Sequence, residues 1–310
     1  MLISVQNGGL SGNPKEIYKL IKDSGFDAVD WNIDHAWERR DVLENGVHAK
    51  CVFTENMDTI LDYWKEHLEA IRENGLKIAQ AHAPFPAYTL SYNGRHPDFL
   101  DYAIEVYKNC IRLCHQAGCP YLVIHGISRR RGLEHPTVEE QDEVNRKLYT
   151  SLIPTLLETD VTVCLENLFT GDPHHLHVSG HCSEPQKAAA FIDELNQTAG
   201  KECFGLCLDV GHLFLLHIDF TYYITTLGTR IKALHIHDND GAADSHLAPY
   251  AGNVPWEDFL SAMKAIGYKG ILNFETFAQV LPTRIPPELV PEFLQHIAAI
   301  GRYFARRIEE

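Results

Sequence analysis

The chain has 310 residues, of which 45% are hydrophobic and 22% charged, so it can bury a large core. Its 27 basic and 42 acidic residues give a formal net charge of −15, and an acidic surface repels nucleic-acid phosphates. No stretch approaches the ~18 uninterrupted apolar residues of a membrane span, and the start, Met-Leu-Ile-Ser-Val, lacks the features of a signal peptide. We therefore expect a cytoplasmic protein without nucleic-acid or membrane partners.

The cysteine pattern points to the same compartment. There are eight cysteines, and none forms a Cys-x-x-Cys pair. Cys164 and Cys207 lie inside apolar runs, as is typical of reduced core thiols in cytosolic proteins. We therefore expect no disulfide bonds.

In the first half of the chain, short apolar runs alternate with segments of helical periodicity. The apolar runs predict strands at 2–5, 26–31, 76–81 and 121–125. Asn13-Pro14 is typical of a helix start, and Gly25 of its end. A second helix carries apolar residues three or four apart from Met57 to Ile71, and a third is expected at about 98–117. A polar loop at about 35–53 follows the second strand.

The same alternation continues in the second half. Strands are predicted at 161–166, 204–209, 231–237 and 270–275. Thr137-x-x-Glu140 and Ser183-x-x-Gln186 are capping boxes that predict helix starts. Further helices are expected at about 255–266 and 288–307, the last with an apolar face that begins at Leu289.

Eight strands, each followed by a helix, predict an α/β protein with a single (β/α)8 TIM-barrel domain over residues 1–310. The strand runs are nearly continuous in apolar residues, as expected where both faces of a parallel sheet are covered. A doubly wound open sheet is the alternative. It would usually carry Gly-x-Gly-x-x-Gly after the first strand, and Gly8-Gly9-x-x-Gly12 does not match that pattern.

Imidazole and carboxylate side chains stand where the last six predicted strands end. They are His82, His125, Glu166, Asp209, His235 and Glu275. Barrel active sites lie at these carboxyl ends, and adjacent strands are ~4.8 Å apart, so such side chains can converge on one ion. Two or three carboxylates plus an imidazole suit a divalent cation; we rank Mn²⁺ first, with Mg²⁺, Co²⁺ and then Zn²⁺ as alternatives.

Each of these residues also has a structural explanation. Asp209, taken alone, is explained better as the cap of the following helix, and a single strand-end histidine is more often a hydrogen-bonded structural residue. Six such groups in series are hard to explain in this way, because burying ionisable groups unpaired costs several kcal/mol each. The series therefore indicates a metal site.

Most of the chain carries an ordered series of short motifs. They are His82-Ala-Pro, Val-Ile-His125-Gly, Leu-Glu166-Asn, Leu-Asp209-Val-Gly-His212, His235-Ile-His-Asp-Asn, Asp244-Ser-His246 and Asn-Phe-Glu275. Together they resemble the xylose isomerase-like TIM barrel superfamily, which includes sugar and sugar-phosphate isomerases and epimerases, inosose dehydratases and endonuclease IV. The series is specific for the superfamily but not for a substrate.

The resemblance implies roles for these residues. In the ketose 3-epimerase branch one ion is held by Glu, Asp, His and Glu, which fall here on Glu166, Asp209, His235 and Glu275. His235 is chosen over His237 because the family pattern is His-x-x-Asp/Glu-Asn. The endonuclease IV branch implies three zinc ions, with further ligands at His82, His125, His212, Asp244 and His246. For a single-ion sugar enzyme we expect substrate binding by His82, His125, His212 and His246, with Asp244 and His246 as alternative ligands of an additional ion.

We therefore expect a metal-dependent isomerase or epimerase acting on a small sugar or sugar phosphate. Glu166 and Glu275 are the expected catalytic acid and base, exchanging a proton with carbon through an enediolate. The alternatives are an endonuclease IV-like tri-zinc phosphodiesterase, a dehydratase or lyase of keto-sugars or keto-inositols, and a non-catalytic sugar-binding barrel. Homo-oligomer formation is implied by the resemblance alone.

Several weaker signals stay open. The segment Ser128–Arg131 and Arg284 either bind a substrate phosphate or carboxylate or lie in solvated loops. A histidine-rich loop with His174, His175, His177 and His181 is favoured as a surface loop over a lid or a second ion site. Trp31, Trp37 and Phe85 are expected in loops near the site, whereas Trp256 is expected in the core at the start of a helix.

Overall fold

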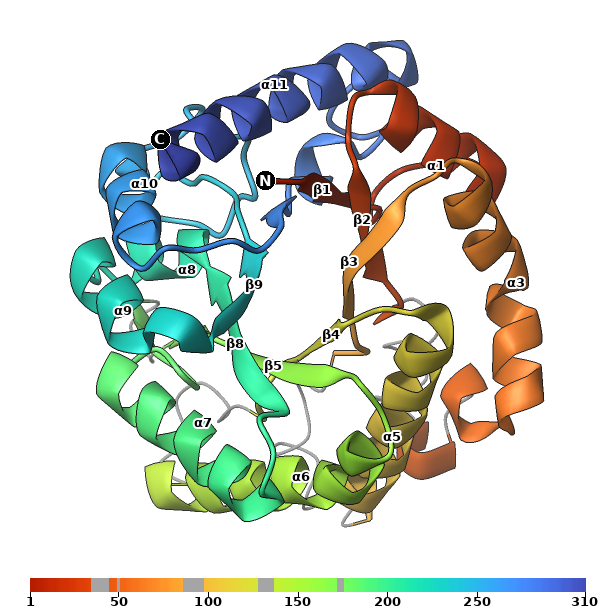
Figure 1. Cartoon of the computed structure of the whole chain (residues 1–310), viewed down its shortest axis with the longest axis vertical. Coiled ribbons are helices and arrows are strands. Elements are labelled where there is room, and N and C mark those ends of the chain that lie inside the picture. Colours follow the sequence, from red (N-terminus) through yellow and green to blue (C-terminus); the bar gives the residue numbers. More distant parts are fainter. Residues whose placement is uncertain (35–44, 49–50, 86–97, 128–136, 172–175) are drawn as a thin grey trace. The chain divides into compact units, whose positions relative to one another are not determined.

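Eight parallel strands alternating with helices form the framework of the protein, as a computed structural model shows (Figure 1). The strand order is β10-β1-β2-β3-β4-β5-β8-β9, and a parallel bridge between Ile236 and Phe274 joins the two ends of that order. The predicted (β/α)8 barrel is therefore confirmed. The structure describes residues 1–34, 45–48, 51–85, 98–127, 137–171 and 176–310.

The chain divides into two compact units, which we describe one at a time. The first comprises residues 1–32, 65–80 and 206–310, and the second comprises residues 33–64 and 81–205. Helix α3 (Met57–Glu73) and strands β3 (Lys77–His82) and β8 (Phe204–Asp209) have residues in both. That the chain is a single domain stays a prediction.

The first unit contains three of the four ligands expected for a single ion, Asp209, His235 and Glu275, at the ends of its strands. Its remaining strands are β1 (Ile3–Gln6), β2 (Ala28–Asn32), β9 (Ile231–His235) and β10 (Leu272–Phe274). Strand β1 pairs in parallel with β10 and with β2, and β8 pairs with β9. The predicted strand at 231–237 ends two residues early, because Ile236 makes only an isolated bridge and Asp238 pairs with the loop residue Leu247.

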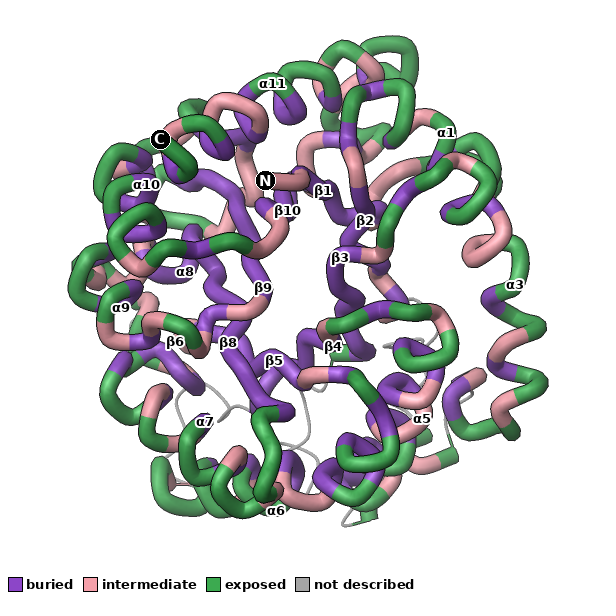
Figure 2. Tube along the Cα trace, viewed as in Figure 1, coloured by how far each residue is buried: buried purple, intermediate pink, exposed green. Residues whose placement is uncertain are grey.

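The longer helices of the first unit have both buried and exposed residues, as Figure 2 shows, whereas the short helix α8 (Val210–Leu215) is buried at all but one of its residues. They are α1 (Pro14–Asp23), α8 (Val210–Leu215), α9 (Phe220–Leu227), α10 (Trp256–Ala265) and α11 (Val290–Glu309). Asn13 caps α1 and forms a capping box with Glu16. Leu289 lies in a 3₁₀ turn, Pro287–Leu289, and is exposed, so placing it on the apolar face of the last helix was wrong.

The second unit holds β4 (Tyr121–Ile124) and β5 (Thr162–Glu166), with helices α5 (Phe99–Ala117), α6 (Val138–Leu157) and α7 (Pro185–Ala199). The predicted Thr137–Glu140 capping box is confirmed at α6. The one predicted at Ser183 is wrong, because Glu184 occupies the N-cap position and the Ser183 hydroxyl donates to the Gly180 carbonyl.

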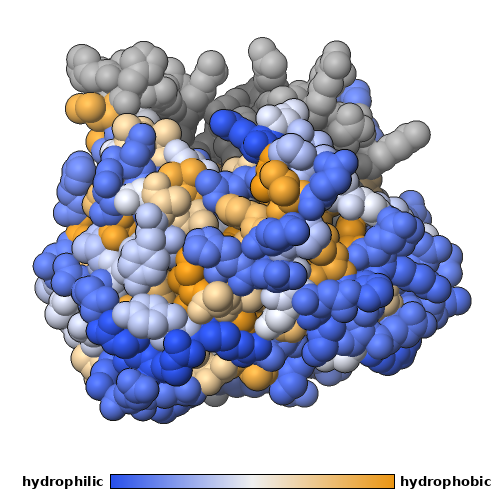
Figure 3. Space-filling model, turned by 90° about the horizontal axis from the view of Figure 1, so that it is seen from above, coloured by the Kyte–Doolittle hydropathy of each residue, from blue (hydrophilic) through white to orange (hydrophobic). Residues whose placement is uncertain are grey.

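A short antiparallel hairpin of β6 (Phe169–Gly171) and β7 (His177–Ser179) follows β5 and was not predicted. All eight cysteines are buried and free, as expected. Hydrophilic side chains dominate the face drawn in Figure 3. Among the described residues, no helix is long and apolar enough to span a membrane.

Candidate metal centre

Strand pairing in the first unit places two predicted ligands side by side. Asp209 is the last residue of β8 and His235 the last of β9, and the two are partners in the parallel register. Glu275 directly follows β10, and its backbone nitrogen donates to the Ile236 carbonyl (3.1 Å), just beyond the end of β9. The carboxyl ends of three strands therefore bring these residues together.

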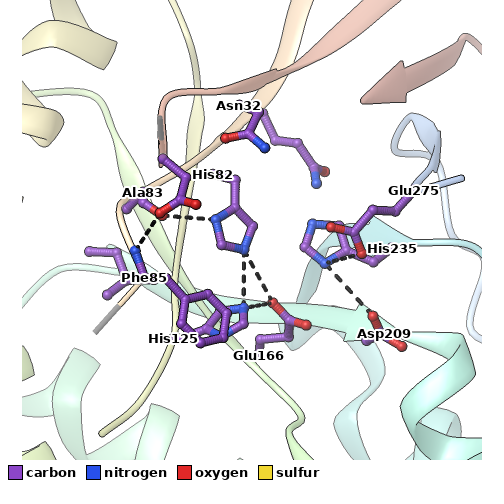
Figure 4. Close-up of polar contacts among 12 residues, drawn as sticks. Asn32, His82, Ala83, Phe85, His125, Glu166, Asp209, His235 and Glu275 are labelled. Atoms are coloured by element: carbon purple, nitrogen blue, oxygen red, sulfur yellow. Dashed lines mark hydrogen bonds and ion pairs between the residues drawn. The ribbon is translucent and has the colours of Figure 1, made fainter. Parts of the chain in front are cut away.

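The side chains of Asp209, His235 and Glu275 form one buried cluster, drawn in Figure 4. The Nδ1 atom of His235 lies 3.9 Å from Oδ2 of Asp209 and 3.5 Å from Oε2 of Glu275. Asp209 and His235 are fully buried and Glu275 is 6% exposed. One ligand atom from each residue lies within 4.8 Å of the others, close enough to share a metal ion.

Asp209 also caps a helix, as its structural explanation expected. Its Oδ1 atom accepts a hydrogen bond from the backbone nitrogen of His212 (2.7 Å), at the start of α8. The Oδ2 atom faces His235. Capping therefore fixes the carboxylate in place while leaving one oxygen toward the cluster, so the two roles are compatible.

A further histidine, His237, contacts the same carboxylate and was passed over in the choice of ligands. It is fully buried, and its Nε2 atom lies 3.1 Å and 3.0 Å from the two oxygens of Asp209. Its ring stacks on His246, with centroids 4.1 Å apart. The ring fits because Gly211 has no side chain: a Cβ atom there would lie 2.0 Å from Cε1 of His237.

Asp244 and His246 form a charged pair beside the cluster. Nε2 of His246 donates to Oδ2 of Asp244 (3.1 Å), and Nδ1 donates to the Glu275 carbonyl (3.0 Å). Burial alone would lower the pKa of His246, but the hydrogen bond to Asp244 and the charges of nearby carboxylates raise that pKa to about 9. Burial would raise the pKa of Asp244, and the charge of His212 and the bonds to the imidazoles hold that pKa well below its usual range.

The second unit holds a separate cluster of His82, His125 and Glu166, also visible in Figure 4. Nε2 of His125 lies 2.8 Å from Oε2 of Glu166 and 3.0 Å from Nε2 of His82. The other ring nitrogen of His82 donates to the Ala83 carbonyl (2.8 Å). The ring of Phe85 lies against His125, with centroids 4.3 Å apart. All three members of the cluster are buried.

The donor set in the first unit fits a divalent cation. Two carboxylates and one imidazole, all buried, each place one ligand atom within 4.8 Å of the others. Two like charges brought this close in a buried environment repel each other, and a bound cation removes that cost. Oxygen and imidazole donors suit Mn²⁺, Mg²⁺, Co²⁺ and Zn²⁺ alike, so the donor set does not select among them.

The weaker sequence signals have mixed outcomes. His181 is buried rather than on the surface, beneath a stacked Tyr149 ring, and burial together with the charge of His125 lowers its pKa to about 4. Trp31 lies inside β2 and is fully buried, so its placement in a loop was wrong. Trp256 begins α10 in the core, as expected.

Other members of these predicted groups stay untested. Phe85 is 39% exposed and Arg284 is exposed, and contact of either with a ligand stays a prediction. Outside the described residues lie Trp37, Ser128–Arg131, His174 and His175.

Comparisons with known proteins agree with this architecture. A protein of Sinorhizobium fredii (strain NBRC 101917 / NGR234), called uncharacterized protein y4fM, is 26% identical over 281 residues, 83% of this chain and 79% of its own. The crystal structure of D-allulose 3-epimerase from Methylomonas sp. in complex with D-allulose matches 99% of this chain and 96% of its own, with a TM-score of 0.68 and 14% identity. The IolI protein with a zinc atom matches over 97% and 96%, with a TM-score of 0.67 and 18% identity.

At these identities the two solved structures show a shared fold. The family model of the xylose isomerase-like TIM barrel matches residues 18–300, which is most of the chain. The resemblance inferred from the ordered motifs is therefore confirmed. This chain belongs to the xylose isomerase-like TIM barrel family.

Proposed function

We propose that this protein is a metal-dependent isomerase or epimerase of a small sugar or sugar phosphate. The main support is that Asp209, His235 and Glu275 form a buried cluster at the carboxyl ends of three strands. The solved structure of a sugar 3-epimerase with the same fold, in complex with D-allulose, supports the choice of substrate class.

The metal would be held by Asp209, Glu275 and Nδ1 of His235, with Mn²⁺ ranked first and Mg²⁺, Co²⁺ or Zn²⁺ as alternatives. A bound divalent ion supplies Lewis acidity, which stabilises negative charge on substrate oxygens. Glu166 ends β5. Its role as a further ligand and second catalytic carboxylate rests on the sequence motif and stays a prediction.

Glu275 is the proposed base that takes a proton from the carbon next to the sugar carbonyl. The side-chain amide of Gln6 donates to Oε1 of Glu275 (2.7 Å), which fixes the orientation of the carboxylate. His212 and His246 lie beside the cluster, and His212 is proposed to hydrogen-bond a sugar hydroxyl. Both ring nitrogens of His246 already donate to Asp244 and the Glu275 carbonyl, so its expected role in substrate binding stays a prediction. A base on one face of the substrate that shuttles the proton gives isomerisation, whereas a base and an acid on opposite faces give epimerisation.

A tri-zinc phosphodiesterase is the second candidate. Two further ligand groups support it: His82, His125 and Glu166 in the second unit, and His237, Asp244 and His246 in the first. The formal net charge of −15 counts against a polyanionic substrate, because it repels phosphates at long range. A cytoplasmic location, a homo-oligomeric state and the dehydratase, lyase and sugar-binding alternatives stay predictions.

The test combines metal content with turnover. Purified protein is expected to carry one equivalent of a divalent metal and to convert at least one member of a panel of ketoses, aldoses and their phosphates. Glu275→Gln is expected to keep the fold and lower kcat by ~10²–10⁴-fold, the range for loss of a general base. Close to three zinc ions with cleavage of abasic-site DNA would favour the phosphodiesterase, and full activity of Glu275→Gln would remove that residue from the mechanism.

A further inference from the structure

A third carboxylate, Asp30, lies buried next to His235 and is used by none of the roles above. It belongs to β2 and is fully buried. Its Oδ2 atom lies 3.5 Å from Nε2 of His235. That nitrogen is the one opposite Nδ1, which faces Asp209 and Glu275. His235 therefore stands between a carboxylate on one side and the candidate ion site on the other.

Two side-chain amides hold Asp30 in this position. Oδ2 accepts hydrogen bonds from Nδ2 of Asn273 (2.7 Å) and from Nε2 of Gln80 (3.2 Å). Each of these amide groups also donates to the carbonyl of Leu234, at 3.2 Å in both cases. Leu234 immediately precedes His235 in β9. The amides therefore fix the carboxylate relative to the very stretch of backbone that carries the imidazole.

We propose that Asp30 is a positioning residue that accepts a hydrogen bond from Nε2–H of His235 and so keeps the Nδ1 lone pair directed at Asp209 and Glu275. This inference rests on the proposed metal-dependent function. A histidine that ligates a metal through one nitrogen needs its other nitrogen protonated, and a carboxylate acceptor selects that tautomer and makes the ligand more basic. The separation of 3.5 Å is longer than a formed hydrogen bond, ~2.7–3.2 Å, and a small rotation of the ring closes the difference.

If Asp30 had a purely structural role, holding the side-chain amides of Asn273 and Gln80, a different effect of Asp30→Asn on metal binding would be expected. Asp30→Asn keeps the shape and an oxygen that can accept from Asn273 and Gln80, so the amide network survives. The same Oδ2 position faces His235, however, so the variant loses the negative charge there, and a neutral amide oxygen is a weaker acceptor for Nε2–H than a carboxylate. If Asp30 only fills the network, Asp30→Asn leaves metal binding unchanged.

The first experiment measures binding of Mn²⁺ alone to the metal-free protein by calorimetry. Asp30→Asn is expected to weaken binding ~10–100-fold, the usual range for a partner of a metal-ligating histidine, and Asp30→Glu is expected to restore part of it. Asp27→Asn is the matched control. Asp27 lies just before the same strand and pairs with Arg302 (2.6 Å) and with the backbone nitrogen of Ile3 (3.0 Å), away from the cluster. It is expected to lower the melting temperature and leave Mn²⁺ affinity unchanged.

The second experiment reads the tautomer directly and needs no variant of Asp30 to fold. In ¹⁵N-labelled, zinc-loaded wild-type protein, the imidazole signal that is absent from His235→Gln is expected to carry its proton on Nε2. A proton on Nδ1, or an Asp30→Asn affinity equal to that of wild type, overturns the inference. If wild-type protein binds neither Mn²⁺ nor Zn²⁺, the proposed function fails instead, so the two failures are distinguishable.

Discussion

The two buried clusters differ in how they balance charge. In the first unit, two carboxylates share one imidazole, His235, at 3.5 and 3.9 Å. In the second unit, two imidazoles share one carboxylate, and His125 contacts both Glu166 (2.8 Å) and His82 (3.0 Å). The second cluster sets one carboxylate against two imidazoles, whereas the first has an excess of negative charge that a cation offsets. We therefore expect similar strand-end residues to have different tasks, with ion binding in the first unit and substrate contacts in the second.

Two other histidines repeat this difference. His246, in the first unit, is held charged by carboxylates, which raise its pKa to about 9. His181, in the second unit, is held neutral by burial, which lowers its pKa to about 4. The first unit thus buries charges in pairs, and the second buries a neutral ring among aromatic side chains.

The largest expected effect is that of Asp209→Asn on metal affinity. An unchanged affinity would contradict the proposed difference between the two clusters. The amide can still cap α8 but lacks the negative charge, so Mn²⁺ binding is expected to weaken by more than the ~10–100-fold typical of outer partners. Calorimetry measures the affinity, and the melting temperature of the metal-free protein is expected to change little. Asp219→Asn is the control, because Asp219 caps α9 with the same 2.7 Å bond to a backbone nitrogen. Equal affinities in both variants would refute the assignment of the ion to the first unit.

A pH series on His181→Gln sharpens the contrast between charged and neutral histidines. The pKa of His181 falls from 6.5 to about 4 on folding, so between these values the unfolded chain binds more protons. Keeping His181 neutral therefore costs no stability above pH ~6.5. As the pH falls toward ~4, the free energy of unfolding decreases, by about 2 kcal/mol between pH 7 and pH 5. Urea unfolding measures it. The wild type should lose more stability than His181→Gln over this range, whereas His296→Gln, at an exposed site, should behave as wild type. Parallel pH profiles for the wild type and His181→Gln would show that His181 is not held neutral.

A smaller effect is expected from His125→Gln in the second cluster. If this cluster contacts substrate, losing one hydrogen bond worth about 0.5–1.5 kcal/mol raises KM by up to ~10-fold. The metal content should stay at one equivalent per chain. His115→Gln, on the exposed side of α5, serves as the control. A drop in metal content in His125→Gln alone would mean that the second cluster also holds an ion, and would move the function toward the phosphodiesterase.

The sequence predicts the framework well because it depends on repeating local patterns. The residues Asp209 and His235 stand out because each ends a nearly continuous apolar run, and parallel pairing then makes them neighbours. The capping box at Thr137 is equally local. Where a choice depends on tertiary contacts, the prediction fails: Ser183 has the right spacing for a cap, but the chain path turns its hydroxyl to the Gly180 carbonyl.

The same limit explains which site residues were missed. Asp30 lies in the middle of an apolar run, and nothing in the run indicates that its carboxylate reaches His235 from another strand. His237 lies two residues beyond His235, and alternation along an extended segment puts both side chains on one side, but the family pattern favoured His235 alone. Strands of three residues, such as those of the hairpin at 169–179, are too short to leave a periodic signal.

The absent side chain of Gly211 constrains how this chain can change over generations. Because a Cβ atom there would lie 2.0 Å from the ring of His237, a mutation at 211 is compatible with the present packing only if the ring shifts or is already gone. A side chain at 211 therefore requires the His237 ring either to move from its place beside Asp209 or to be replaced. As long as the ring keeps its present contacts with Asp209, position 211 is restricted to glycine, and relatives that carry a larger residue there should lack the histidine or place its ring elsewhere.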